Sequence, residues 1–449
     1  MPLSERSDTK KIGRHGRAEM RFLVLDPHGD ATDVAWRAKI AGNEVRHFIR
    51  DTPRTCHIGH GLVDVVRDFK PHLDWADLIF MADNLLYMRD IDSFRAFKPN
   101  ALIVGPTAET ASWELDRAKG FQVCKKHGIA TPIYKEFSDY DAAIAYVKKR
   151  DCRLVSKPFG DADKALTYCA GGPDPVADMI FMLQKWKKQQ KLKGSFILQD
   201  FIEGIEMAAD CWCGPHGFDL GWSESFEFKK LMSGNYGINT GEMGTVLGFT
   251  RRSKLARQVL EPLGEELSRQ RYCGYLSVNT IIDRSGQPWF LEFTARPGWP
   301  TWNIECAVHS EDDPASRLYQ LASGTDSRSV MLDKVAIGVV VALPSFPHSH
   351  SLAKDIDGIP IHGVDQRMVH HFHPCQVRCE DGQLQTAGDY VAVITARANT
   401  VSQARESVYE RAKKVYVPGG VAVRDDIGER LAKQLPELHK HGYATWLNY

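Results

Sequence analysis

The most informative stretch of the chain for its fold is YLSVNTIIDRSGQPWFLEFTARPG, residues 275–298. Two runs with alternating apolar residues flank Ser285 and Gly286, a pattern that predicts an antiparallel β-hairpin. Asn279 stands on the first strand, and Glu292 stands on the second strand between two apolar neighbours. Because a buried carboxylate needs a partner, Glu292 is a candidate metal ligand.

Three segments precede the hairpin and carry polar side chains in a fixed order. Residues 110–128 and roughly 252–271 are predicted to be helical, and Asp116-Arg117 opens a helix that is predicted to end near KKHG, residues 125–128. Lys157 lies on a predicted strand, and Lys164 follows it in a polar loop. The third segment is LQDFIEGIE, residues 198–206, which reads as a strand followed by a turn.

The rest of the chain predicts a multidomain α/β and α+β protein. Residues 20–106 alternate strand-like and helical runs, which predicts parallel β-α-β packing in a Rossmann-like domain. Residues 107–324 form a second domain, and a polar stretch near residue 325 separates it from a β-rich α+β domain over 325–449. The polar and basic tail, residues 1–19, has no apolar signal region and is expected to be disordered.

Composition excludes several classes of protein. Lys and Arg number 57, as do Asp and Glu, so a broadly basic nucleic-acid-binding protein is excluded. No run of about 18 apolar residues occurs, so no transmembrane helix is expected. Ten cysteines in 449 residues are too sparse for a disulfide scaffold, which indicates the cytoplasm. Neither a P-loop nor a dinucleotide-binding glycine motif is present, so any nucleotide site uses another design.

The ordered segments resemble the ATP-grasp superfamily, in which two α+β lobes hold ATP. FKKLMSGNYGINTGEMG, residues 228–244, resembles the Pro-Asn-Thr-Gly-Gly-Met-Gly segment of the glycinamide ribonucleotide synthetase (phosphoribosylamine–glycine ligase) family. LEFTARPGWP, residues 291–300, and VAVRDDIGERLAK, residues 421–433, also resemble that family. The resemblance is collinear from about Arg21 to about Lys433 and implies a two-lobed ATP-grasp core with a small lobe at about 130–200.

The resemblance implies an ATP site with a metal ion, Mg²⁺ or Mn²⁺. A triphosphate needs cations, a ribose needs an acceptor for its hydroxyls, and magnesium needs hard oxygen ligands. Backbone groups of an extended segment can serve the adenine edge. The implied cofactor residues are Arg117, Lys157, Lys164, Gln199, Asp200, Phe201, Ile202 and Glu206, and the implied metal ligands are Asn279, Glu292 and Thr294.

The implied activity is that of a ligase that joins a carboxylate to an amine through an acyl phosphate. The expected partners are small molecules, a glycine-like amino acid and an amine on a nucleotide or sugar-phosphate acceptor, bound by a monomer or homodimer. The implied catalytic residues are Arg296, Lys229 and Lys230, and the implied substrate-binding residues are Gly237, Asn239, Thr240, Gly241, Arg296 and Gly298. The alternative is a catalytically impaired protein that binds nucleotide in a regulatory role.

Departures from the family pattern concentrate where the substrates would bind. The first loop of the family is glycine-rich and helps to hold a phosphoribosyl group, whereas this chain has Asp26-Pro27-His28-Gly29-Asp30. Its carboxylates would repel a phosphate. One loop glycine is Glu242, and the neutral Asn279 and Thr294 leave one sure negative charge at the metal site. The sequence therefore indicates a divergent member of the family, in which the ATP-binding residues match the family pattern better than the substrate-binding residues do.

Overall fold

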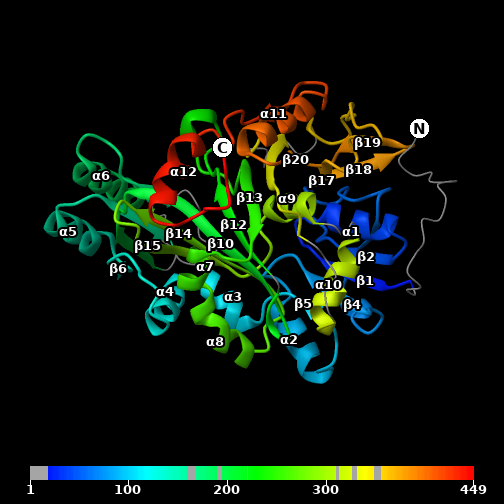
Figure 1. The fold of residues 1–449 in the computed structure, drawn as a ribbon, viewed down its shortest axis with the longest axis horizontal. Coiled ribbons are helices and arrows are strands. Elements are labelled where there is room, and N and C mark those ends of the chain that lie inside the picture. Colours follow the sequence, from blue (N-terminus) through cyan, green and yellow to red (C-terminus); the bar gives the residue numbers. More distant parts are fainter. Residues whose placement is uncertain are drawn as a thin grey trace. The chain divides into compact units, whose positions relative to one another are not determined.

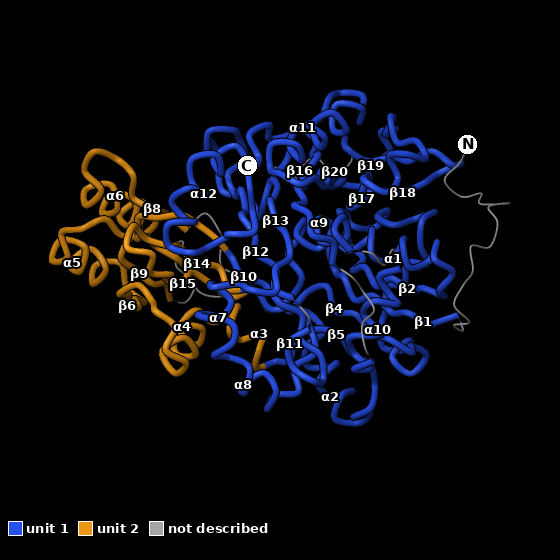
Figure 2. The backbone as a smooth tube through the Cα atoms, in the orientation of Figure 1, with its two compact units in different colours: residues 1–108, 208–277, 294–449 blue, residues 109–207, 278–293 orange. Residues whose placement is uncertain are grey.

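The computed structural model describes residues 19–158, 167–189, 195–219, 221–309, 313–325, 331–347 and 355–449. The predicted tail over residues 1–18 and the predicted phosphate ligand Lys164 lie outside the described residues. The chain forms two compact units (Figure 2). Unit 1 comprises Met1–Ala108, Ala208–Ser277 and Thr294–Tyr449, and unit 2 comprises Glu109–Met207 and Val278–Phe293. The predicted 107–324 domain is thus divided between both units.

Unit 1 begins with a parallel sheet, as the sequence predicts. Its strands lie in the order β3-β2-β1-β4-β5, and every neighbouring pair is parallel. The elements are β1 (Arg21–Leu25), α1 (Thr32–Ile40), β2 (Glu44–Phe48), β3 (Asp64–Val66), β4 (Leu78–Met81), α2 (Met88–Phe97) and β5 (Ile103–Val104). In Figure 1 this blue region shows the Rossmann-like arrangement of strands and helices.

An antiparallel sheet fills the rest of unit 1. Strands β10, β12, β13, β16, β20 and β17 are neighbours in that order. The elements of this part are β10 (Gly204–Gly214), β11 (Gly217–Phe218), β12 (Trp222–Glu227), β13 (Gly244–Thr250), α7 (Lys254–Val259), α8 (Gly264–Arg269), α9 (Thr301–Val308) and α10 (Pro314–Ser323). The chain continues through β16 (Val335–Ala342), β17 (Phe372–Pro374), β18 (Val377–Glu380), β19 (Gln383–Thr386), β20 (Tyr390–Ala398), α11 (Val401–Ala412), β21 (Ala422–Val423) and α12 (Leu431–Lys440).

The C-terminal region joins this sheet directly. Strands β13 and β16 pair antiparallel from Gly244 opposite Val339 to Gly248 opposite Val335. All eight residues of β16 are buried, because its apolar side chains are covered on both faces. Strands from both sides of the predicted boundary near residue 325 therefore belong to one continuous sheet.

Unit 2 contains a second antiparallel sheet with the order β6-β9-β7-β8. Its elements are α3 (Ala108–Leu115), α4 (Arg117–Lys126), β6 (Tyr134–Phe137), α5 (Tyr140–Arg150), β7 (Leu154–Pro158), β8 (Tyr168–Cys169), α6 (Pro175–Lys188) and β9 (Phe196–Asp200). The sheet and α5 and α6 share a core that includes Leu154, Leu183, Trp186 and Phe196. The predicted hairpin is confirmed as β14 (Gly274–Asp283) and β15 (Pro288–Thr294), with Gly286 at φ 82° in its turn.

Two predicted helices are each broken in the structure. The helix expected over residues 110–128 is two helices, because the Asp116 side chain accepts a hydrogen bond from the Lys119 amide at 3.1 Å and caps α4. The helix expected over about 252–271 is α7, a short 3-10 turn and α8, with Pro262 inside the turn.

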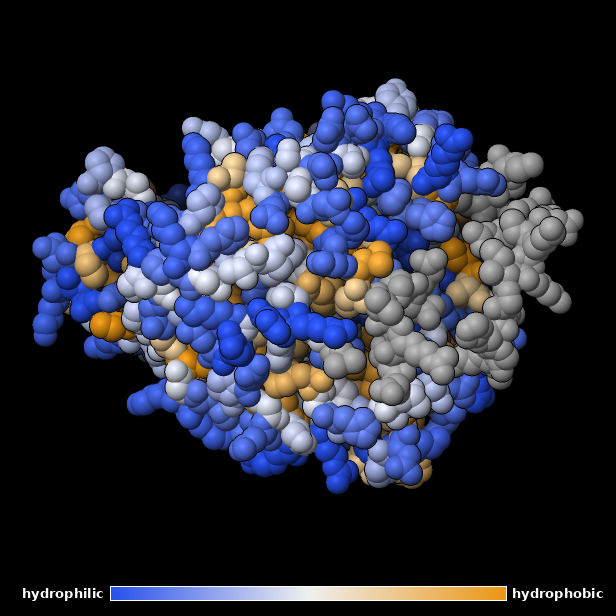
Figure 3. All heavy atoms as spheres, in the orientation of Figure 1, coloured by the Kyte–Doolittle hydropathy of each residue, from blue (hydrophilic) through white to orange (hydrophobic). Residues whose placement is uncertain are grey.

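The described helices are all too short or too polar for one of them to traverse a lipid bilayer. On the face drawn in Figure 3, hydrophilic side chains predominate and the apolar ones are scattered among them.

Candidate active site

Three of the predicted nucleotide-site residues lie together in unit 2. Arg117 Nη1 lies 3.5 Å from Glu292 Oε2, and Arg117 Nε donates to the Pro158 carbonyl at 3.1 Å. Lys157 Nζ donates to the carbonyl of Leu291 at 3.2 Å. The structure therefore brings two cations from α4 and β7 to the same short stretch of β15.

Burial of Lys157 determines how its ammonium group can interact with an anion. It is only 9 % exposed, on a strand that lies between β8 and β9. An ammonium group removed from water must be satisfied by oxygen atoms, and its field on a nearby anion is stronger than in water. Lys157 can therefore hold a phosphate oxygen at the position where it now meets a carbonyl.

The donors available for a metal ion are one carboxylate and two neutral oxygens. Glu292 and Thr294 are two residues apart on β15, so both point to one face of the strand, and Asn279 lies on the neighbouring strand β14. Among the described residues, no group of three or more His, Cys, Asp or Glu side chains can hold a metal. Mg²⁺ is often bound by one or two carboxylates together with substrate phosphates. The donor set fits an ion that completes its shell with ATP oxygens.

The segment predicted to meet an adenine edge has one amide left for a ligand. The Asp200 amide donates to the Ile133 carbonyl at 2.9 Å, and the Phe201 amide donates to the Arg153 carbonyl at 3.1 Å. Within the described part of the chain, the Ile202 amide makes no backbone hydrogen bond. The Ile202 amide is therefore the one in this segment that could donate to a ligand.

Gln199 and Glu206 flank this segment in different environments. Gln199 is 2 % exposed, and its Oε1 has no hydrogen-bond partner among the described residues. An orphaned buried oxygen indicates a missing donor, such as an amino group of a ligand. Glu206 is exposed on β10, where a carboxylate can accept from ribose hydroxyls.

In unit 1, the predicted substrate loop closes on itself. The Lys229 carbonyl accepts from the Thr240 amide at 2.8 Å and from the Thr240 hydroxyl at 2.9 Å. Lys229 Nζ pairs with Glu227 at 3.1 Å, and Lys230 Nζ donates to the Gly237 carbonyl at 3.3 Å. Both lysines thus contact neighbouring residues of the loop and of β12.

The remaining predicted loop residues are at its surface. Asn239 forms an isolated bridge with Lys230, and Gly241 is exposed. Gly237 needs its glycine because its φ is +78°. Glu242 is 6 % exposed, and its Oε1 has no partner among the described residues. Burial, with Glu227 nearby, raises the pKa of the Glu242 carboxyl well above its ordinary value.

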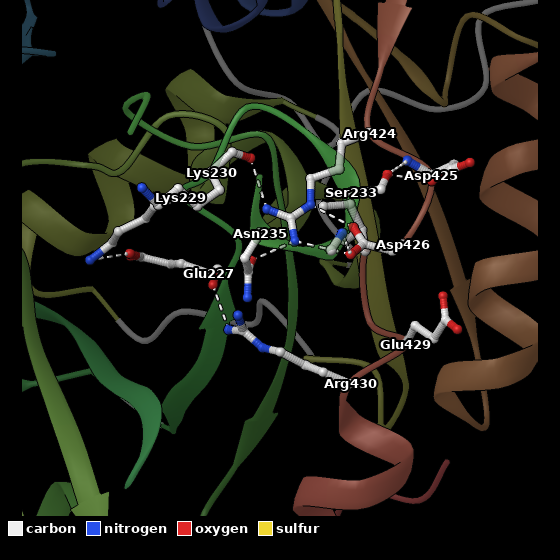
Figure 4. Close-up of polar contacts among 12 residues, drawn as sticks. Glu227, Lys229, Lys230, Ser233, Asn235, Arg424, Asp425, Asp426, Glu429 and Arg430 are labelled. Carbon is white, nitrogen blue, oxygen red and sulfur yellow. Dashed lines mark hydrogen bonds and ion pairs between the residues drawn. The ribbon is translucent and has the colours of Figure 1, made fainter. Parts of the chain in front are cut away.

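A C-terminal arginine with no predicted role holds this loop (Figure 4). Arg424 is 2 % exposed, and it donates to the Lys230 carbonyl and to Asn235 Oδ1, each at 2.8 Å. Its Nε and Nη2 donate to the two oxygens of Asp426 at 2.5 and 3.1 Å. The guanidinium also lies 5.1 Å from the ring centre of Phe228.

Residues that follow Arg424 in the chain also bind the substrate loop and the end of β12. The Gly234 amide donates to Asp426 Oδ2 at 2.8 Å, and the Asp425 amide donates to Ser233 Oγ at 3.2 Å. Arg430 donates to the Glu227 carbonyl at 2.7 Å. Segment 424–430, here called the Arg424 clasp, therefore holds the first part of the substrate loop, residues 227–235.

The first loop of unit 1 is organised around Asp26. Its buried carboxylate accepts from the amides of His28, Gly29 and Ala31 at 3.2, 2.9 and 2.7 Å. His47 Nε2 completes the set at 3.0 Å. Burial alone would raise the pKa of the Asp26 carboxyl, but the hydrogen bond and charge of His47 hold the pKa below its ordinary value.

Arg296 faces carboxylates of this first loop. Burial and the charge of Asp26 raise the pKa of Asp30 to about 6, while the charges of His28 and Arg296 oppose that rise. Arg296 Nη1 also donates to the Pro297 carbonyl at 3.2 Å. Gly298 lies just beyond, where its carbonyl accepts the first amide hydrogen bond of α9 at 2.9 Å.

The predicted site residues divide cleanly between the two compact units. The nucleotide and metal residues in unit 2 are Arg117, Lys157, Gln199, Asp200, Phe201, Ile202, Glu206, Asn279 and Glu292. The residues in unit 1 are Lys229, Lys230, Gly237, Asn239, Thr240, Gly241, Thr294, Arg296 and Gly298. No role was predicted for the Arg424 clasp, although its sequence carried part of the family resemblance.

Two protein-family models match this chain. The phosphoribosylglycinamide synthetase ATP-grasp (A) domain matches residues 118–301, and the phosphoribosylglycinamide synthetase C domain matches residues 336–430. Together the matched segments cover more than half of the chain.

Curated relatives match nearly the whole length. Phosphoribosylamine–glycine ligase of Salmonella typhimurium is 24 % identical over 439 residues, which is 92 % of this chain and 98 % of that protein. The ligase of the same name from Ralstonia nicotianae is 28 % identical over 357 residues, covering 77 % of this chain and 82 % of that protein.

Solved structures share the fold at lower identity. Phosphoribosylamine–glycine ligase from Thermotoga maritima has a TM-score of 0.70 and 21 % identity, and covers 91 % of this chain and 100 % of that one. Biotin carboxylase from Campylobacter jejuni has a TM-score of 0.61 and 14 % identity, with 95 % of this chain and 97 % of that one covered. The expected fold class is thus confirmed. The chain is a divergent member of the phosphoribosylglycinamide synthetase family of ATP-grasp proteins.

Proposed function

We propose that this protein is an ADP-forming ligase that joins a carboxylate to an amine at the expense of ATP. The observation that carries the proposal is the convergence of Arg117 and Lys157 on β15 beside Glu292. Two cations and one carboxylate in that arrangement suit a nucleotide triphosphate with a divalent ion.

The reaction has two balanced steps. A carboxylate oxygen attacks the terminal phosphorus of ATP, so that an acyl phosphate forms and ADP leaves. The nitrogen of a neutral amine then attacks the acyl carbon, the bond from carbon to the phosphate oxygen breaks, and inorganic phosphate and a proton leave the amide.

The protein contributes position and charge in these steps. Arg117 and Lys157 would neutralise the phosphates, and each well-placed donor of this kind can contribute about 3 kcal/mol. The Ile202 amide and Glu206 would orient adenine and ribose. Glu292, with Asn279 and Thr294, would hold Mg²⁺ or Mn²⁺, which would add positive charge at the phosphates.

The substrate-side roles follow the family resemblance. Arg296 would bind the carboxylate substrate, for which a glycine-like amino acid is the first candidate. Lys229, Lys230 and the loop over 237–244 would border the amine. The acceptor expected by resemblance is an amine on a nucleotide or sugar phosphate, as the name phosphoribosylamine–glycine ligase states for the relatives.

The test is ADP and phosphate release measured with Mg²⁺ and a matrix of amino acids and amines. Release that requires both a carboxylate and an amine, with an amide of matching mass, supports the ligase. ATP binding without release across the matrix supports the alternative, a nucleotide-binding regulatory protein. The neutral residues Asn279 and Thr294 are the feature that favours this alternative, because they add no negative charge for a metal ion.

A further inference from the structure

The first loop of unit 1 already contains its own anion. Backbone amides that converge on one point form a site for a phosphate or carboxylate. Here Asp26 supplies that carboxylate, with amide distances of 2.9 Å from Gly29 and 2.7 Å from Ala31. A ligand phosphate at this point would have to displace a buried side chain and would meet its negative charge.

Further carboxylates lie beside Asp26 without partners of their own. Within the described chain, Asp30 makes no hydrogen bond or ion pair, and Asp83 Oδ2 is buried with no partner. Asp30 interacts electrostatically with both Asp26 and Asp83, so the three carboxylates form one group.

Glu242, from the substrate loop, is a further carboxyl group with an unpartnered oxygen. Its side chain is more than nine-tenths buried, and its Oε1 has no partner among the described residues. Burial raises the pKa of the Tyr390 hydroxyl, and the charges of both Glu242 and Asp30 add to that rise, so both carboxylates lie near this one side chain. A buried oxygen without a donor indicates that a donor comes from a ligand.

The positive groups around these carboxylates are too few to balance them. His47 pairs with Asp26, and Arg296 and His28 interact electrostatically with Asp30. Lys229 interacts with Glu242 but is paired with Glu227. The carboxylates of this part of unit 1 are Asp26, Asp30, Asp83, Asp210, Glu227 and Glu242. The surroundings of the acceptor loop are therefore acidic.

We propose that the acceptor of this ligase is a cationic amine, with a second ammonium or similar positive group and no phosphate, and that Asp30 and Glu242 bind that second group. The inference rests on the proposed ligase function and names its substrate class. An ammonium group has three donors, which matches unpartnered carboxylate oxygens. The other nitrogen of the same acceptor, in its neutral form, attacks the acyl carbon, and the bound ammonium keeps its charge throughout.

Three matched acceptors test the proposal, because they differ only in the charge of one end. 1,4-Diaminobutane has a positive end, 4-amino-1-butanol a neutral end and 4-aminobutyl phosphate a negative end. We expect kcat/KM for ADP release with glycine to be at least about tenfold higher for the diamine than for the alcohol, and lowest for the phosphate. Equal values for all three, or the highest value for the phosphate, overturn the proposal.

Two variants locate the effect. Asp30→Asn and Glu242→Gln should each reduce the diamine-over-alcohol ratio by about tenfold, because each removes one of the two carboxyl groups proposed to bind the ammonium. Asp64→Asn is the matched control, since Asp64 is exposed on the edge strand β3, and the ratio for this variant should stay unchanged. An unchanged ratio in both site variants contradicts the assignment, and Glu242→Gln decides alone if Asp30→Asn does not fold.

Direct binding separates this proposal from the ligase function. Calorimetric titration of 1,4-diaminobutane into the protein without ATP should show binding that the two site variants weaken by about tenfold. If no amine supports ADP release but the diamine binds in this way, the ligase proposal fails and the cation site stands. If ADP is released but the diamine shows no such binding or preference, the cation site fails and the ligase stands.

Discussion

Replacement of Arg424 by lysine tests whether the Arg424 clasp positions the substrate loop. Arg424 makes two hydrogen bonds to the loop, to Lys230 and Asn235, and two more to Asp426. A lysine keeps the positive charge but has no planar fork, so it cannot reach Asp426 and both loop oxygens together. At least two hydrogen bonds of a charged group are then lost.

The magnitude follows from the burial of this guanidinium. Arg424 is 2 % exposed, so the oxygens it leaves are not fully resolvated. Hydrogen bonds to charged groups contribute about 1.5–3 kcal/mol each, and partial replacement by an ammonium offsets some of that loss. We expect Arg424→Lys to lower the free energy of unfolding of unit 1 by about 2–4 kcal/mol.

Denaturant unfolding and steady-state kinetics together measure this effect. The Michaelis constant for the amine should rise, because the loop with Lys229 and Lys230 loses its fixed position, while the constant for ATP should not change. Arg257→Lys is the matched control, since Arg257 is exposed on α7. Wild-type stability and wild-type amine kinetics in Arg424→Lys would refute the positioning role, as would an equal rise in both Michaelis constants.

Four further predictions follow from single residues. Glu292→Gln should reduce Mg²⁺-dependent ADP release at least about 100-fold. The free energy of unfolding should change by less than about 1 kcal/mol, because the ion pair of Glu292 is partly exposed. Wild-type release at saturating Mg²⁺ would contradict the metal site. Lys157→Met should weaken ATP binding about tenfold or more in calorimetry, and unchanged affinity would remove Lys157 from the phosphate site. Gly363→Ala should destabilise the fold by more than about 2 kcal/mol in a denaturant melt, since at φ +86° a Cβ would lie 1.8 Å from a backbone carbonyl oxygen. Gly419→Ala is the control: its φ is +90° but the space around it is open, so the free energy of unfolding should fall by only about 1 kcal/mol. The pKa of Asp30, raised to about 6, means that the folded state binds more protons than the unfolded state between about pH 4 and 6, so its contribution to stability falls as pH rises through that window. Asp30→Asn should therefore gain stability relative to the wild type between pH 4.5 and 7.5, and a constant difference would contradict the shift.

Local sequence patterns were sufficient for most of the fold. Alternating β-prone and helical runs predicted the parallel sheet, because short apolar strands joined by helices pack in one way. The apolar spacing over residues 110–128 does not show the break at Asp116, whereas the capping hydrogen bond of the Asp116 side chain marks the start of α4. Pairing of β13 with β16 joins residues that are far apart in the chain, and no local pattern predicts it.

The prediction of the nucleotide half of the site rests on a different kind of signal. Arg117, Lys157 and Glu292 lie on three separate elements, so their individual patterns are weak, and their collinear order carried the prediction. The structure brings them together within unit 2. Arg424 lies 194 residues from Lys230, and its fork recognises backbone carbonyls and an asparagine of the loop. Such contacts leave no spacing signal in the sequence.

The acceptor half shows how a few acidic side chains change the chemistry of a family fold. Asp26 satisfies the amides of the first loop with its own carboxylate, so this loop is ordered without a ligand. The same carboxylate lies beside Asp30, and the buried Glu242 and Asp30 both interact electrostatically with Tyr390. A phosphate gains no free amide there and is repelled, whereas an ammonium group gains two acceptors. Under the proposal above, the acidic side chains of unit 1 would select a cationic amine, and Arg117 and Lys157 in unit 2 would bind the phosphates of ATP.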